Sequence, residues 1–153
     1  MSKYLVILMP MIFHLQGCNS AKAESPIPSM EYEVIHESDY NEYADTTNKS
    51  TIVLSSQYEY QNELLKRTSE ASKTINFETE TVLLIDMGTQ NSGGYSMSTE
   101  LIDKGDYINA NITYVFPGDS CSTDQAITNP FKFIKVNSKQ YIIVTEELTY
   151  SSC

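Results

Sequence analysis

The sequence predicts a mainly β domain, an antiparallel β-sandwich or roll with one short α-helix. Short apolar or alternating runs recur from residue 30 to the end of the chain, and turn-forming residues separate them. Only one segment carries the periodicity of an amphipathic helix. A stretch of this length fits a single domain with one core, so we expect one β domain over residues 30–153.

The first elements are a strand, a second short strand and a helix. "MEYEVIH" (30–36) alternates apolar and acidic residues, which predicts an edge strand with one solvated face. "TIVL" (51–54) is β-branched and predicts another strand. Ser56 and Glu59 have the spacing of a capping box and predict a helix over about 58–71. Its apolar stripe is expected at Tyr60, Leu64, Leu65 and Thr68.

The remaining elements are all strands. "TVLLIDM" (81–87) is a nearly continuous apolar run, which predicts a central strand buried on both faces. Residues 95–103 and 107–116 alternate around "KGD", which predicts a hairpin with Gly105 at a positive φ. "FKFIKV" (131–136) and "QYIIVTEEL" (140–148) predict a last hairpin.

The first residues predict export rather than structure. One Lys precedes an apolar segment over residues 4–15, whose last residue, Leu15, begins the sequence Leu-Gln-Gly-Cys18. A helix of that length spans about 18 Å, short of the roughly 30 Å core of a bilayer. We therefore expect a lipoprotein-type signal peptide over 1–17, a lipid on Cys18 and a tether over 18–29. The alternative is an ordinary secretory signal with an accidental Cys.

This N-terminus predicts a lipid-anchored protein of the bacterial cell envelope. Asn19 after the Cys favours the outer membrane or cell surface over the inner membrane. The net charge of −10 makes nucleic-acid binding very improbable, because such a surface repels phosphates. Contact with the membrane is then expected through the lipid on Cys18.

Two further cysteines, Cys121 and Cys153, agree with an oxidising compartment. A disulfide between them would be worth about 3–4 kcal/mol in the chain-entropy model and would fasten the end of the chain. The alternative is a pair of independent thiols.

Catalytic chemistry has few candidates. His36 is the only His after the signal segment, and its strand position favours a half-buried structural role over that of a general base. No cluster with metal-ligand spacing and no phosphate-binding Gly loop is present in the sequence. Glu146 and Glu147 fall on opposite faces of their strand, so they cannot form a catalytic pair. We expect no cofactor, no metal and no enzymatic activity.

The segment between the strands at 81–87 and 95–103 has two interpretations. In the first, its glycines only turn the chain, one at a positive φ and one allowing close packing, while the Tyr covers the core. In the second, it is an exposed loop with small side chains that lets another protein's backbone approach. The candidate binding residues are Thr89, Gln90, Asn91, Ser92, Gly93, Gly94 and Tyr95.

From Met30 onward the chain resembles the PrcB family of protease-complex subunits. The resemblance rests on "TINFETETVLLIDMGTQNSGGYSM" and "FPGDSCSTDQAITNPFKFIKV". The matching positions are Asn76-Phe77, Gly88, Gly93-Gly94-Tyr95, Pro117, Cys121 and Pro130.

The resemblance implies a noncatalytic secreted or surface lipoprotein that associates with an exported protease and supports its maturation or stability. Two alternatives stay open. One is a chagasin-like protease inhibitor that inserts the 89–95 loop into a cleft. The other is an envelope lipoprotein with an unrelated ligand.

Overall fold

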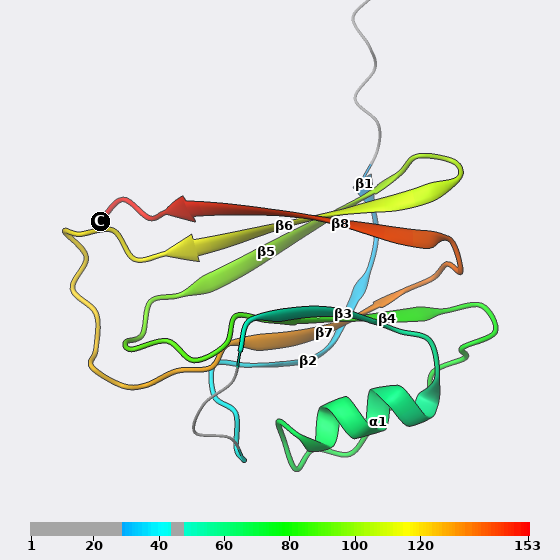
Figure 1. Ribbon diagram of the computed structural model, residues 1–153, viewed down its shortest axis with the longest axis horizontal. Helices are drawn as coiled ribbons and strands as arrows, with labels where there is room; N and C mark the ends of the chain where they lie inside the picture. The colour runs from blue at the N-terminus through cyan, green and yellow to red at the C-terminus, as the bar shows by residue number, and fades with distance from the viewer. Residues whose placement is uncertain (1–28, 44–47) are drawn as a thin grey trace, which may run out of the picture.

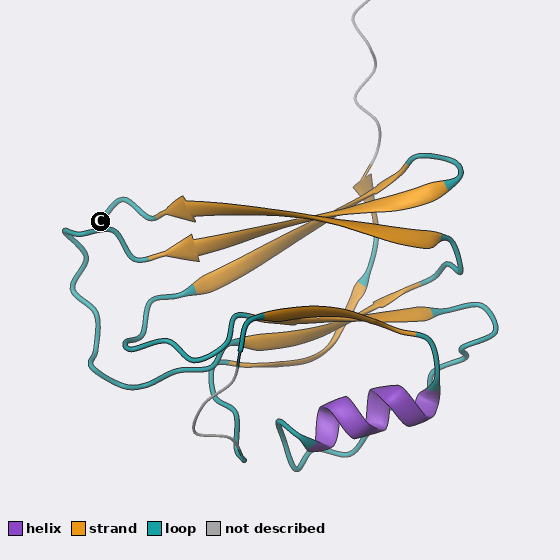
Figure 2. Cartoon of the chain, in the orientation of Figure 1, coloured by secondary structure: helices purple, strands orange, loops and turns teal. Residues whose placement is uncertain are grey.

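The computed structural model describes residues 29–43 and 48–153, and these residues form two β-sheets and one α-helix. The sheets pack face to face, and the helix lies beneath the lower sheet (Figures 1 and 2). The mainly β class predicted from the sequence is confirmed, with a sandwich and one short helix. The predicted lipidation site Cys18, the signal peptide and all of the tether except Ser29 lie outside the described residues.

The upper sheet is called the open sheet below, because none of the described residues forms a helix on its outer face (Figure 2). Its strands, in spatial order, are β1 (Ser29–Met30), β5 (Ser96–Asp103), β6 (Tyr107–Phe116) and β8 (Tyr141–Tyr150). β5 and β6 form the predicted hairpin, and Gly105 turns the chain between them at a φ of 88°. β8 pairs with β6 in parallel over its whole length, from Tyr141 beside Tyr107 to Tyr150 beside Phe116.

The lower sheet, called the covered sheet below, is antiparallel throughout and lies between the open sheet and the helix. Its strands, in spatial order, are β2 (Glu33–Ser38), β7 (Phe131–Val136), β4 (Thr81–Asp86) and β3 (Ser50–Leu54). All six residues of β4 are buried, as expected for a central strand. Both faces are covered because the open sheet packs on one and the helix on the other.

The helix α1 (Gln57–Leu65) begins at the predicted cap, where the Glu59 N–H donates to Ser56 Oγ. It ends six residues earlier than predicted, and Leu65, expected in the apolar stripe, is 64% exposed. The chain leaves the helix because the next side chains have partners elsewhere. Arg67 donates to Asp86 in β4, and Thr68 donates to Glu42 in the loop after β2.

Two separate apolar clusters hold the layers together. The larger lies between the sheets and is built from alternating residues of β4, β5, β6, β7 and β8. The smaller lies between the covered sheet and α1, where Tyr60 and Leu64 meet Val82, Leu84 and Phe133. Alternate residues of β4 therefore serve different cores, which is why that strand reads as a continuous apolar run.

The predicted hairpin of 131–136 and 140–148 is wrong. β7 lies inside the covered sheet between β2 and β4, so neither of its edges is available to β8. The turn at Ser138 instead carries the chain across to the open sheet, where β6 still has a free edge.

The predicted strand over 30–36 is also corrected. The segment forms two strands in different sheets, and the pairing of β2 with β7 shifts register between Val34 and His36. This irregularity buries Ile35 and His36 together and leaves Val34 41% exposed. The alternation of apolar and acidic residues over 30–36 therefore does not correspond to one strand with one solvated face.

Candidate protein-binding surface

The 88–95 loop lies at the end of the sandwich that also holds the C-terminus, beside the long connection from β6 to β7 (Figure 1). It starts from a well-defined corner after β4. Met87 donates its N–H to the Pro130 carbonyl, and Gly88, at a φ of 71°, donates its N–H to Asp86 Oδ1. The loop therefore leaves a buried strand in a fixed direction.

The loop is hydrogen-bonded along its length to the 123–130 segment. Gln90 and Thr128 exchange backbone hydrogen bonds of 2.8 and 3.1 Å as an isolated β-bridge. The buried Thr128 also donates its hydroxyl to the Ser92 carbonyl at 2.9 Å. Asn129 donates its side-chain amide to Thr89 Oγ1 at 2.8 Å. These contacts bind two loops, distant in sequence, into one surface.

The two adjacent glycines have different roles. Gly94 adopts a φ of 85°, a conformation that side chains rarely allow. Gly93 approaches Asp124 so closely that a Cβ would collide with Asp124 Oδ1, and its N–H donates to that oxygen at 2.8 Å. The loop backbone therefore requires Gly94, whereas a side chain at position 93 would displace the Asp124 carboxylate that accepts from its N–H. This agrees with the structural interpretation of the sequence, in which one Gly has a positive φ and the other allows close packing.

The accessible tip of the loop is small. Tyr95 is partly buried against the inter-sheet core and meets Phe116 edge to face, with ring centroids 5.1 Å apart. Asn91 and Gly94 are exposed, whereas Gln90 and Ser92 are half-buried. Gln90 also uses its amide, which donates to the Met87 carbonyl at 2.8 Å. Of the seven candidate binding residues, Asn91 and Gly94 are the most available to a partner.

A disulfide joins Cys121 in the β6–β7 connection to Cys153, with the two Cα atoms 5.1 Å apart. The tail before Cys153 is held as well, because Ser151 donates its N–H to the Phe116 carbonyl at 2.8 Å. Phe116 also packs edge to face on Tyr150, the last residue of β8. The loops, the disulfide and the end of β8 thus form one continuous end of the molecule.

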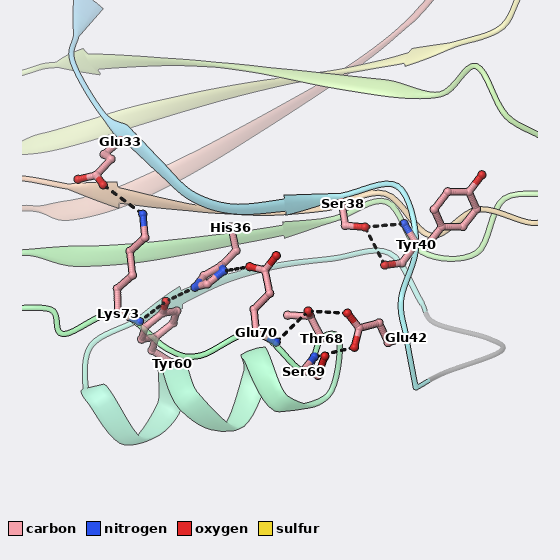
Figure 3. Close-up of polar contacts among 10 residues, drawn as sticks. All are labelled: Glu33, His36, Ser38, Tyr40, Glu42, Tyr60, Thr68, Ser69, Glu70 and Lys73. Carbon is pink, nitrogen blue, oxygen red and sulfur yellow. Dashed lines mark hydrogen bonds and ion pairs between the residues drawn. The ribbon is translucent and has the colours of Figure 1, made fainter.

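His36 lies in a buried polar network on the helix side of the covered sheet (Figure 3). Its Nδ1 is 2.6 Å from Glu70 Oε2, and its Nε2 is 2.7 Å from the Tyr60 hydroxyl. Tyr60 is completely buried, and this burial raises the pKa of its phenol. Because the imidazole is buried and both of its nitrogens have partners, the network fastens the segment after α1 to β2 and offers no base to a substrate.

The pair Arg67–Asp86 was not foreseen from the sequence. Arg67 Nε donates to Asp86 Oδ2 at 2.8 Å, and its Nη1 donates to the Glu63 carbonyl and carboxylate. Both Arg67 and Asp86 are buried. The signal in the sequence was a single Asp within an otherwise apolar strand, because buried acids require a charged partner.

The free edge of β8 is the other feature that sequence reasoning missed, although the strand itself was predicted. Its long edge is exposed above β3, where Glu146 accepts hydrogen bonds from Lys49, Thr51 and Tyr114. These bonds outweigh the opposing effect of partial burial and lower the pKa of Glu146. A hollow of about 510 Å³ opens here, lined by Lys49, Ser50, Thr51, Val144 and Glu146.

Within the described ranges, no three His, Cys, Asp or Glu residues are grouped so that they could hold a metal ion. The α-helix found there is not long and apolar enough to cross a membrane.

Comparison with known proteins gives one family match. Residues 81–137 match the family model described as PrcB C-terminal, which confirms the resemblance noted in the sequence. The match runs from the start of β4 through the 88–95 loop and the β5–β6 hairpin to the residue after β7. Neither the curated proteins nor the solved structures contain a significant match.

Proposed function

Because residues 81–137 match the PrcB C-terminal family, we propose that this chain is a noncatalytic subunit of a protease complex. The family match suggests association with such a complex. In this proposal the chain binds an exported protease in the bacterial envelope and supports its maturation or stability.

The observation that carries the proposal is the fixed 88–95 loop within the matched region. Its backbone is held by Thr128 and Asp124, and its exposed tip carries only small side chains. A loop that is already ordered loses little conformational entropy on binding. Rigid β scaffolds that present loops in this way commonly bind proteins.

The geometry favours an adaptor over an inhibitor. An inhibitory wedge must project side chains or backbone into a protease cleft. Here Gln90, Ser92 and Gly93 are partly covered by the neighbouring 123–130 segment. A shallow contact through Asn91 and Gly94 fits association with a protein surface better than insertion into a deep cleft.

The proposal also includes the predicted lipid anchor. A lipid on Cys18 would hold the domain at the outer membrane or cell surface. The tether over residues 18–29 would then link the lipid to the acidic domain and bring that domain to an exported partner.

Site-directed photo-crosslinking in the native envelope tests the proposal. A photoreactive residue at Asn91 is expected to form an adduct with an exported protease, identified by mass spectrometry. The matched control is the same residue at Tyr58, which is 74% exposed and lies in α1, beneath the covered sheet. An adduct pattern at position 91 without a protease, or identical to that at position 58, would contradict the proposal.

A further inference from the structure

The two sheets have four outer strands, and two of them are poorly suited to pairing with another chain. β1 contains two residues, and β2 is interrupted by a register shift between Val34 and His36. β3 offers an edge of five residues, half the length of β8. Short strands and irregularities of this kind protect sheet edges from unwanted pairing.

β8 has none of these protections. It is ten residues long, pairs with β6 without a register shift and contains no Pro, Gly or Lys. Eight of its ten residues are exposed. In the described part of the chain, no strand pairs with its other edge. An edge this long and regular offers a row of backbone donors and acceptors to an additional strand.

The side chains around the edge would also suit an added strand. The hollow beneath it has Val144 and Glu146 on the β8 side and Thr51 on the β3 side. Leu148 and Val53 are 49% and 42% exposed on these two strands. Side chains on the inward face of an added strand would enter this hollow, while those on the other face would lie beside Glu147.

Charge decides between a second copy of this chain and a different partner. The chain carries a net charge of −10, and the only charged residues of β8 are Glu146 and Glu147. Antiparallel pairing of two copies would bring two acidic molecules together along these strands, which repulsion disfavours. A neutral or basic strand would complement the edge.

The edge is continuous with the loop surface. The rings of Tyr95, Phe116 and Tyr150 contact one another in turn, which links the 88–95 loop to the last residue of β8. One partner bound at the loops would therefore meet the β8 edge without crossing another layer of the molecule.

We propose that β8 accepts an extended, neutral or basic segment of the partner protease as an additional antiparallel strand. The inference rests on the proposed function for the identity of that partner. Antiparallel pairing is chosen because parallel pairs are slightly less stable per residue. Backbone hydrogen bonds would supply affinity, and the hollow beside Val144 would supply selectivity for side chains.

The test uses two adjacent proline variants, Glu147→Pro and Leu148→Pro, each in the full chain. Consecutive N–H groups of a strand point to opposite edges, so one Pro removes a donor to β6 and the other removes a donor from the free edge. The melting temperature shows which variant is which, because only the variant that loses a donor to β6 breaks the existing ladder. The other variant is called the edge-blocked variant. The probe is the exported protease that co-purifies with the wild-type chain.

We expect the edge-blocked variant to melt as the wild type does and to recover at least about tenfold less protease, as the loss of a hot-spot contact would cause. In the wild-type complex, hydrogen exchange should slow at alternate amides of β8. Equal recovery by the wild type and the edge-blocked variant, or unchanged exchange in β8, would overturn this inference while leaving the proposed function intact.

The other outcomes are also decisive. If the wild-type chain recovers no protease, both proposals fail. If sedimentation shows a dimer that only the edge-blocked variant disrupts, the occupant of the edge is a second copy, and the assignment to the protease is overturned.

Discussion

The covered sheet and the open sheet are both four-stranded, yet they differ in what lies on their outer faces. In the covered sheet, β4 and β7 are buried on both faces because α1 packs beneath them. In the open sheet, β6 alternates between buried and half-buried residues because no helix formed by residues 29–43 or 48–153 covers it. In the described part of the chain, one nine-residue helix thus buries the outer face of one sheet, while the outer face of the other sheet stays accessible.

Polar groups follow the same division. Beneath the covered sheet, Arg67 and Asp86 form a buried ion pair, and the buried His36 is paired with the exposed Glu70. On the outer face of the open sheet, Ser98, Asn111, Thr113 and Glu147 border a shallow hollow of about 390 Å³. Polar side chains therefore hold α1 against the covered sheet, and they keep the outer face of the open sheet hydrated.

The largest effect is expected from the buried ion pair that holds the end of α1 on β4. Arg67→Met should lower the free energy of unfolding by about 3–5 kcal/mol, because Asp86 remains buried with its charge uncompensated. The control is Lys66→Met, since Lys66 forms an exposed ion pair with Glu63, and such pairs contribute about 0–1 kcal/mol. Urea unfolding measures both, and equal losses would mean that Asp86 does not depend on Arg67.

The next largest effects on stability concern pairs of adjacent residues, one pair in β4 of the covered sheet and one pair in β6 of the open sheet. Leu83→Ala and Leu84→Ala should each cost about 2–5 kcal/mol, because the two side chains fill different cores. In β6, Ile112→Ala should cost a similar amount, whereas Thr113→Ala should change stability by less than about 0.5 kcal/mol.

Thermal or urea unfolding of these four variants tests whether α1 covers its sheet in solution. A loss below about 1 kcal/mol for Leu84→Ala alone, well under the usual cost of a core truncation, would show that it does not.

The smallest effect concerns pH and the contact between the two sheets at Glu146. Partial burial opposes ionisation, but hydrogen bonds from Lys49, Thr51 and Tyr114 keep the pKa of Glu146 below its ordinary value of 4.5. A carboxylate with a lowered pKa stabilises the fold above its unfolded pKa, and this contribution disappears as pH falls through the lowered value.

Glu146→Gln should therefore reduce the loss of stability as pH falls from about 6 through the ordinary pKa of 4.5 and below it. The difference should be at most about 1 kcal/mol, because the side chain is partly exposed and screened by solvent. Glu147→Gln removes the same charge on the opposite face and should leave the acid dependence close to that of the wild type. An identical effect of the two variants would indicate a response to net charge alone.

Much of the fold could be predicted from local sequence. The continuous run 81–87, the Gly105 hairpin and the Ser56 cap each follow from short-range chemistry, and all three are present. The end of α1 could not be predicted, because Arg67 and Thr68 are drawn from the helix by Asp86 and Glu42, which are distant in sequence. The register shift in β2 could not be predicted for the same reason, because it depends on the pairing of β2 with the distant strand β7.

The candidate site was predicted only in part. The 88–95 loop could be located by its glycines and small polar residues. Its accessible portion depends on Thr128 and Asp124, which no local pattern connects to it. The edge of β8 was missed because its sequence fits a hairpin with β7 as well as a parallel pair with β6.

The sequence by itself determined the class of the fold and the positions of most strands, because side-chain periodicity and turn residues act over a few neighbours. It also carries the resemblance to the PrcB C-terminal family over residues 81–137. Tertiary structure decided which sheet each strand joins, which face α1 covers and which edge remains free. Those choices depend on burying two apolar faces of β4 and β7 at once, and that requirement can be met only when distant segments pack together.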